Sequence, residues 1–283
     1  MKKGKKQNEP EYLASALNTP MLNYRVYHMG KKEKLINGLV IFAIGGLAGL
    51  CFYGGLFRDA DGNSTSATSI SNLVVFVLVG LIAVKYFLPI RREQLRQKRL
   101  SELTHQFRSF LEAVATSLSS GMNMVEATIG ANNDLRTQYS DSSYIVAETN
   151  EMIVGMQNNI PIEDMLESLG ERSEISDIKN FAVVFRISYR AGGNLKEIVK
   201  RTNSIISERM EISEEIETAL SSNKMQFNAM MVIPVVMMLL LRLMSSSFSA
   251  SFATLPGVIA ISIAIVIFVV SYKLGQKIMN VKG

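Results

Sequence analysis

The chain has 283 residues, of which 48% are hydrophobic, and it carries one cysteine, two histidines, no tryptophan and a formal net charge of +5. Its length permits one large domain or two small ones. The single Cys51 excludes an intrachain disulfide, and His28 and His105 stand far apart with no cysteine beside them, which argues against a structural zinc site.

The net charge is unevenly distributed along the chain. Residues 1–34 have eight Lys or Arg against three Asp or Glu, and residues 91–99 have five against one, whereas residues 100–225 have eleven against nineteen. The basic segments lie beside apolar ones, and we expect the cluster at 91–99 to attract anionic lipid headgroups. The acidic middle argues against a nucleic-acid partner, which requires a basic face on the folded domain itself.

Four apolar runs have the length of about 20 residues that the bilayer core demands. We predict transmembrane helices over residues 35–57, 70–90, 226–244 and 256–274, joined in pairs by external loops at 58–69 and 245–255. Gly45 and Gly49 in the first run have a spacing that permits close approach of a neighbouring membrane helix, although glycine is also simply common in such helices.

The orientation follows from the rule that basic residues stay on the cytosolic side. The tail at 1–34, the cluster at 91–99 and the lysines of the tail at 275–283 are predicted to be cytosolic, so both termini lie on that side of a multi-pass protein of the cytoplasmic (inner) membrane. Residues 91–225 then form a cytosolic domain between the second and third spans. Whether the N-terminal tail packs on the membrane or on this domain is left open by its sequence.

Apolar residues of the cytosolic domain recur at three- and four-residue steps, which is typical of amphipathic helices. The first helix shows this in one stripe of Leu103, Phe107, Phe110, Leu111, Val114 and Leu118. We predict three helical hairpins in this domain. The fold class is therefore an all-α integral membrane protein with four transmembrane helices and a cytosolic six-helix bundle.

Two local predictions refine this bundle. The second helix is expected to begin at Met124 and end near Asn132, followed by a loop at 133–143. On the last helix, the seven-residue steps of the apolar residues predict packing against a nearly antiparallel neighbour, and the helix is expected to continue into the third span with little break. Those residues are Ile198, Ile205 and Ile212.

The pattern Gly-x-Asn-apolar-x-Glu occurs twice and predicts helix turns, because Gly can end a helix in the left-handed conformation while Asn caps the next helix and Glu reaches back to the cap. The copies comprise Gly121, Asn123 and Glu126, and Gly192, Gly193, Asn194 and Glu197. A third turn, at 159–163, keeps the Asn and the Glu and places Pro161 in the first helical turn. We interpret all three as structural rather than reactive.

No catalytic constellation is found. The phosphate-binding loop G-x-x-x-x-G-K-[ST], the dinucleotide motif G-x-G-x-x-G, the nucleophile motif G-x-S-x-G and the zinc motif H-E-x-x-H are all absent. We therefore expect no enzyme activity, no cofactor and no metal site, although a cation among the acidic residues is a weak alternative. A transporter is disfavoured because no Asp or Glu lies within a predicted span.

Four stretches of the chain resemble the F domain of type II secretion systems. They are 107–112 (FRSFLE), 118–127 (LSSGMNMVEA), 160–166 (IPIEDML) and 190–198 (RAGGNLKEI), and the resemblance extends over residues 100–274. Their order, with two spans before the domain and two after it, is more specific than any single motif. The chain looks most similar to the tight-adherence (TadB/TadC-like) proteins of Flp pilus assembly.

The resemblance implies an integral-membrane platform protein of a type IV/Flp pilus or type II secretion assembly. In such machines the platform meets a cytosolic secretion ATPase and helps to lift pilin subunits into the filament. The longer platform proteins carry two F domains and this chain has one, so a homodimer or a paralogous platform protein is expected to supply the second. The alternative, from another functional class, is a membrane-anchored helical scaffold for signalling or regulation.

Overall fold

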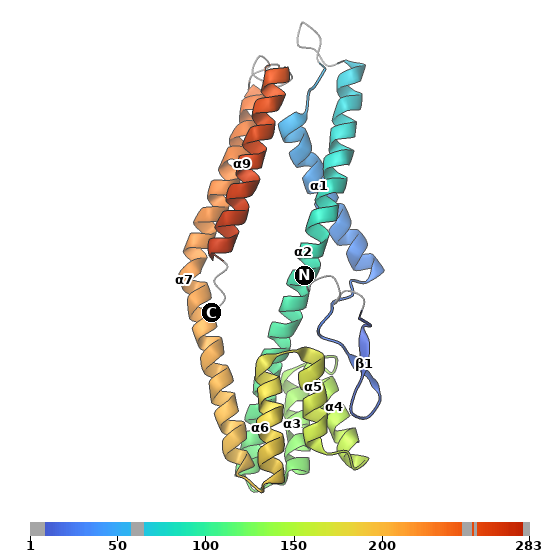
Figure 1. Cartoon of the computed structure of the whole chain (residues 1–283), viewed down its shortest axis with the longest axis vertical. Coiled ribbons are helices and arrows are strands. Elements are labelled where there is room, and N and C mark those ends of the chain that lie inside the picture. The colour runs from blue at the N-terminus through green and yellow to red at the C-terminus, as the bar shows by residue number, and fades with distance from the viewer. Residues whose placement is uncertain (1–8, 58–64, 245–250, 252–253, 280–283) are drawn as a thin grey trace. The chain divides into compact units, whose positions relative to one another are not determined.

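The computed structural model describes residues 9–57, 65–244, 251 and 254–279, and nearly all of these are helical (Figure 1). Most of the predicted loop at 245–255, part of the loop at 58–69 and the ends of both tails lie outside the described residues. The elements are β1 (Tyr12–Ala14), β2 (Pro20–Leu22), α1 (Lys31–Tyr53), α2 (Ser66–Ser119), α3 (Met124–Gln138), α4 (Tyr144–Gln157), α5 (Ile162–Ser173), α6 (Ser176–Arg190), α7 (Leu195–Met244) and α9 (Leu255–Met279).

The chain divides into two compact units. The helical unit combines Met1–His28 with Arg92–Ile212, and the apolar unit combines Met29–Arg91 with Ser213–Gly283. Helices α2 and α7 are each continuous across the boundary between the units, because α2 contains Arg92 and α7 contains Ile212. The expectation that the last helix of the domain continues into the third apolar run is therefore correct.

The core of the helical unit is aromatic and aliphatic. All residues of the predicted stripe on α2 are buried except Leu118, which is partly buried. Phe107 packs edge-on against Phe181 of α6, with ring centroids 5.6 Å apart. Burial of large apolar side chains of this kind supplies the main driving force for such a bundle.

Helix α3 is longer than predicted. It continues to Gln138, so the expected loop at 133–143 begins six residues later than we predicted. The reason is that its apolar face does not stop at Asn132, since Ala127, Ala131 and Leu135 follow one another at four-residue steps and all three are fully buried.

The predicted contact face of α7 is correct at Ile198, which packs against the core, and wrong by one residue at Ile205 and Ile212. Ile205 and Ile212 are 44% and 48% exposed, whereas Val199 and Ile206 are buried. The seven-residue spacing is present in both sets, so periodicity alone did not distinguish the two registers.

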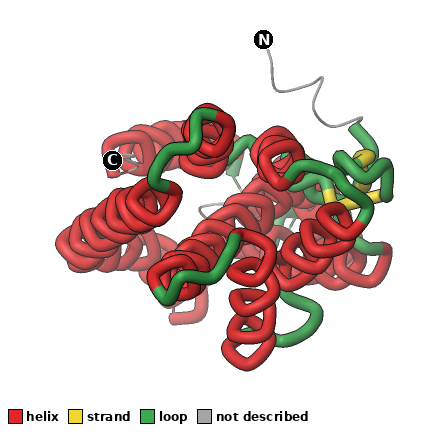
Figure 2. The backbone as a smooth tube through the Cα atoms, turned by 90° about the horizontal axis from the view of Figure 1, so that it is seen from below, coloured by secondary structure: helices red, strands yellow, loops and turns green. Residues whose placement is uncertain are grey.

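The N-terminal tail is part of the helical unit, which resolves the alternative that the sequence left open. Strands β1 and β2 pair antiparallel with Leu13 opposite Met21, and they are the yellow segments beside the helices in Figure 2. After β2, Tyr24 and Val26 are buried. This hairpin is the one departure from an all-α architecture among the described residues.

The apolar unit contains four helices long and apolar enough to cross a membrane, in α1, α2, α7 and α9. Helix α1 starts and ends four residues earlier than the predicted span at 35–57. A hydrogen bond of 2.9 Å joins the hydroxyls of Tyr53 in α1 and Ser262 in α9. On α7 and α9, the rings of Phe227 and Tyr272 stack 6.0 Å apart.

Candidate functional site

Three helix–helix turns of the helical unit share one backbone geometry. In each, the second residue after the helix end is left-handed, namely Gly121 (φ 85°), Asn159 (φ 61°) and Gly192 (φ 67°). The next N–H bonds back five residues, from Met122 to Ser117, from Ile160 to Gly155 and from Gly193 to Ser188, at 3.2, 2.9 and 2.8 Å. This is the Schellman arrangement that satisfies the last carbonyls of a helix.

The first turn also carries a complete capping box. The Asn123 side chain accepts a hydrogen bond of 2.9 Å from the Glu126 N–H, and the Glu126 carboxylate accepts one of 3.0 Å from the Asn123 N–H. At the third turn, the Glu197 N–H donates to Asn194 at 3.3 Å, but the Glu197 carboxylate receives the side-chain amide of Asn194 instead of its backbone N–H. The third box is therefore only half formed.

The middle turn is aligned differently from our sequence interpretation. Asn159 does not cap α5, because it takes the left-handed position that Gly121 and Gly192 hold in the other turns. Pro161 is the N-cap residue of α5. The sequence predicted it one position later, within the first helical turn. The correct equivalence shifts by two residues, and it follows from the ability of Asn to adopt the left-handed region.

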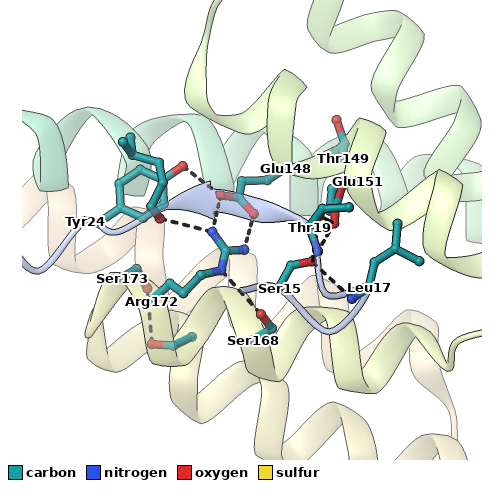
Figure 3. A network of polar contacts seen from close by, with 12 residues as sticks. Ser15, Leu17, Thr19, Tyr24, Glu148, Thr149, Glu151, Ser168, Arg172 and Ser173 are labelled. Carbon is teal, nitrogen blue, oxygen red and sulfur yellow. Dashed lines mark hydrogen bonds and ion pairs between the residues drawn. The ribbon is translucent and has the colours of Figure 1, made fainter. Parts of the chain in front are cut away.

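A buried ion pair lies between α4 and α5 (Figure 3). Arg172 donates to both carboxylate oxygens of Glu148, at 2.8 and 2.5 Å, and the two side chains are 4% and 1% exposed. The hydroxyl of Tyr24, from the N-terminal segment, donates to Glu148 at 2.9 Å. Arg172 also donates to the Leu22 carbonyl at 3.2 Å, and Tyr24 N–H donates to the Arg172 carbonyl at 3.1 Å.

Further polar contacts fix the same N-terminal segment to α4 and α5. Ser15 and Thr19 both donate to the Glu151 carboxylate, the former at 2.6 Å. Arg25 donates to the Glu171 carbonyl at 2.6 Å through Nη2 and at 2.8 Å through Nε. The segment at residues 15–25 is therefore held in place by hydrogen bonds to α4 and α5, which lie more than 120 residues later in the sequence.

The environment shifts two pKa values in this cluster. Burial, followed by the charge of Glu148 and the hydrogen bond to it, raises the pKa of Tyr24 well above its ordinary value of 10.0. Burial works against the charged form of Arg172, but the hydrogen bond and the charge of Glu148 outweigh it and raise the pKa of the guanidinium. Arg172 thus stays charged in the interior, where each of its three guanidinium nitrogens donates a hydrogen bond.

Sequence reasoning missed this cluster. A signal was present, since Glu148 interrupts the apolar run of α4 and Arg172 follows the buried Leu169 on the same face of α5. Of the residues that we predicted for the α5 end, Glu163 is buried, and its carboxylate accepts a hydrogen bond of 3.3 Å from the half-exposed Arg190.

Helix α6 has a second apolar face that nothing described covers. Ile178, Phe181 and Phe185 are buried in the core, while Val183, Val184 and Ile187 are 53%, 46% and 64% exposed. Exposed apolar side chains that cluster on one helix mark interaction sites more often than single ones do. This exposed α6 face is therefore a candidate interaction surface.

His105 is exposed on α2. Among the described residues, no three His, Cys, Asp or Glu side chains come together as metal ligands. The candidate site thus consists of two features, the buried cluster of Tyr24, Glu148 and Arg172 and the exposed α6 face.

Comparisons with known proteins give one finding. No curated protein and no solved structure matches the chain significantly. Residues 110–241, from the end of α2 to the apolar part of α7, match the family model described as type II secretion system (T2SS), protein F.

Proposed function

We propose that the chain is an inner-membrane platform protein of a type II secretion or type IV/Flp pilus assembly, most similar to the tight-adherence B/C group. In this function it couples a cytosolic secretion ATPase to the extraction of pilin subunits from the membrane. The observation that supports the proposal most is the family match, because it covers the four inner helices of the helical unit together with the stretches of α2 and α7 that flank them.

The continuity of α2 and α7 fits this mechanism. Each helix joins the helical unit to an apolar run without a loop, from Ser66 to Ser119 and from Leu195 to Met244. A continuous helix transmits displacement along its axis, since its residues are fixed to the turn before them by backbone hydrogen bonds, and Pro89 in α2 and Pro234 in α7 are the positions that lack this donor. An ATPase acting on the helical unit would then move segments that lie among the pilins.

The proposal includes a topology. Residues 91–225 and both termini are cytosolic, and the loops at 58–69 and 245–255 are external. The basic cluster at 91–99 lies against anionic lipid at the cytosolic surface.

Deletion of the gene is the direct test of this function. We expect loss of surface filaments or of secretion, and recovery of a secretion ATPase with the affinity-purified full chain. Normal filaments in the deletion strain would contradict the platform assignment. A kinase, phosphatase or transcription partner in the purified material would favour the signalling scaffold instead.

We further propose that a second copy of the chain supplies the second F domain of the platform, by docking through the exposed α6 face. Three clustered β-branched residues at i, i+1 and i+4 make this face an exposed apolar patch of the kind that marks interaction sites. A second copy presents the same face, so a two-fold interface can be self-complementary.

Val184→Glu is expected to convert the purified dimer to a monomer, because a carboxylate would lose its hydration on the apolar interface. The mass of the full chain in mild detergent, measured by light scattering, reports this change. Val154→Glu is the matched control, since Val154 is a similarly exposed valine on α4. A wild-type chain that is monomeric, or two variants with equal masses, would exclude this interface and favour a paralogous partner.

A further inference from the structure

Helices α1 and α2 approach each other most closely at glycines. A Cβ on Gly49 would lie 2.8 Å from the Cβ of Val79, and one on Gly80 would lie 2.7 Å from the ring of Phe42. Gly45 is likewise packed against Ala83. The small-residue spacing seen in the sequence is therefore a contact between these two helices, and close backbone approach of this type stabilises helix pairs in membranes.

A groove opens between the two helices on one side of this contact. Its volume is about 410 Å³, which lies in the range of small-molecule sites. Its walls are apolar except at the N-terminal end of α1, where Lys31 and Lys34 line the groove. The lining residues are Lys31, Lys34, Leu35, Gly38, Leu39, Phe42, Val84 and Leu88.

Gly38 makes the groove open in the middle. A Cβ at this position would meet no atom within 4 Å, in contrast to the crowded glycines of the contact. The absence of a side chain at Gly38 leaves the space between Leu35 and Phe42 free. A larger residue there would occupy the groove without disturbing the packing of α1 on α2.

The charge at the groove's end is positive. Lys31 and Lys34 line it, and Arg91, at the end of the apolar run of α2, donates to Asn37 at 3.4 Å. The groove thus combines an apolar length with a cationic end. A soluble anion would leave the apolar walls unused, and a neutral lipid would leave the lysines without a partner.

We propose that this α1–α2 groove binds one anionic phospholipid, with an acyl chain along Leu35, Leu39 and Leu88 and the phosphate between Lys31 and Lys34. The groove belongs to two helices of membrane-spanning length, so lipid is the medium around it. Lysine stems extend along apolar surface while their amines reach the headgroup level. This site adjoins the basic cluster at 91–99 through Arg91, and it does not depend on the platform assignment.

The test is native mass spectrometry of the purified full chain in mild detergent, titrated with phosphatidylglycerol or with phosphatidylcholine of the same acyl chains. We expect one phosphatidylglycerol to be retained at concentrations at which phosphatidylcholine is not. The double variant Lys31→Gln, Lys34→Gln is expected to bind phosphatidylglycerol roughly thirtyfold more weakly, since each basic residue near an anionic headgroup contributes about a factor of five.

Matched controls separate the groove from general surface charge. Lys32→Gln removes the same charge from the same turn outside the groove lining, and it is expected to leave binding unchanged. Gly38→Leu is expected to abolish retention with all lysines in place, whereas Val40→Leu, on an exposed part of α1, is expected to have no effect. Circular dichroism of each variant checks that its helix content is that of the wild type.

Four results would overturn the proposal. They are equal retention of the two lipids, equal loss in Lys32→Gln and in the double variant, full retention by Gly38→Leu, and displacement of the lipid by millimolar inorganic phosphate. A disulfide between copies through Gly38→Cys, in a Cys51→Ala background, would also overturn it, because a second protein helix would then occupy the groove. Filament assays play no part in these measurements, so either proposal can fail alone.

Discussion

Arg172→Met is expected to lower the free energy of opening of α4 and α5 by about 3–5 kcal/mol, because it leaves the carboxyl group of Glu148 buried and without its bidentate partner. Hydrogen exchange of the α4 and α5 amides in the full chain measures this free energy at neutral pH. Removing Arg172 alone is expected to cost more than removing both members of the pair, since burial of an isolated charged group is the costly step.

The triple variant Tyr24→Phe, Glu148→Met, Arg172→Met is the decisive comparison for this prediction. It removes all three polar groups together, and most of the lost free energy should return. Arg136→Met is the surface control, since its ion pair with Asp141 is 3.7 Å long and exposed, and about 0–1 kcal/mol is expected there. Equal losses in Arg172→Met and the triple variant would contradict an electrostatic origin.

Stability of the helical unit is expected to fall as the pH rises above about 10. The pKa of Tyr24 is raised in the folded state, so below its ordinary value of 10.0 the hydrogen bond to Glu148 contributes fully. At higher pH the unfolded chain releases the phenolic proton while the folded chain retains it, and the contribution is progressively lost until the folded pKa is passed. We expect the segment at residues 15–25 to detach first, because it carries Tyr24.

Thermal unfolding by circular dichroism between pH 8 and 11 measures this dependence. At pH 8 the Tyr24→Phe variant should be less stable by about 1.5–3 kcal/mol, the usual contribution of a hydrogen bond to a charged group. The difference between variant and wild type should then shrink above pH 10, because the variant has no proton to release at this position. Curves that stay parallel over the whole range would show that another group governs the alkaline loss.

Much of the helical architecture was predictable because its signals are local. The apolar stripe on α2 and the left-handed glycines at Gly121 and Gly192 depend on residues within a few positions of one another. The F-domain resemblance, which combined these local features, is supported over residues 110–241. Periodicity and turn chemistry are the features that a single sequence expresses most clearly.

The missed features depend on distant partners. Ile205 and Val199 belong to equally spaced sets on α7, and only the position of the rest of the core decides which set is buried. The pairing of Glu148 with Arg172 and Tyr24 joins three segments, and no residue near Glu148 in the sequence indicates which distant residues it contacts. At the middle turn, Asn159 could serve either as a cap or as the left-handed residue, and the preceding helix end decided the outcome.

The attachment of the N-terminal segment has a consequence for the connections between the two units. The chain passes between the helical and apolar units three times, at residues 28–29, 91–92 and 212–213. With that segment fastened through Tyr24 and Glu151, and α1 beginning at Lys31, the first of these connections is a short stretch of chain.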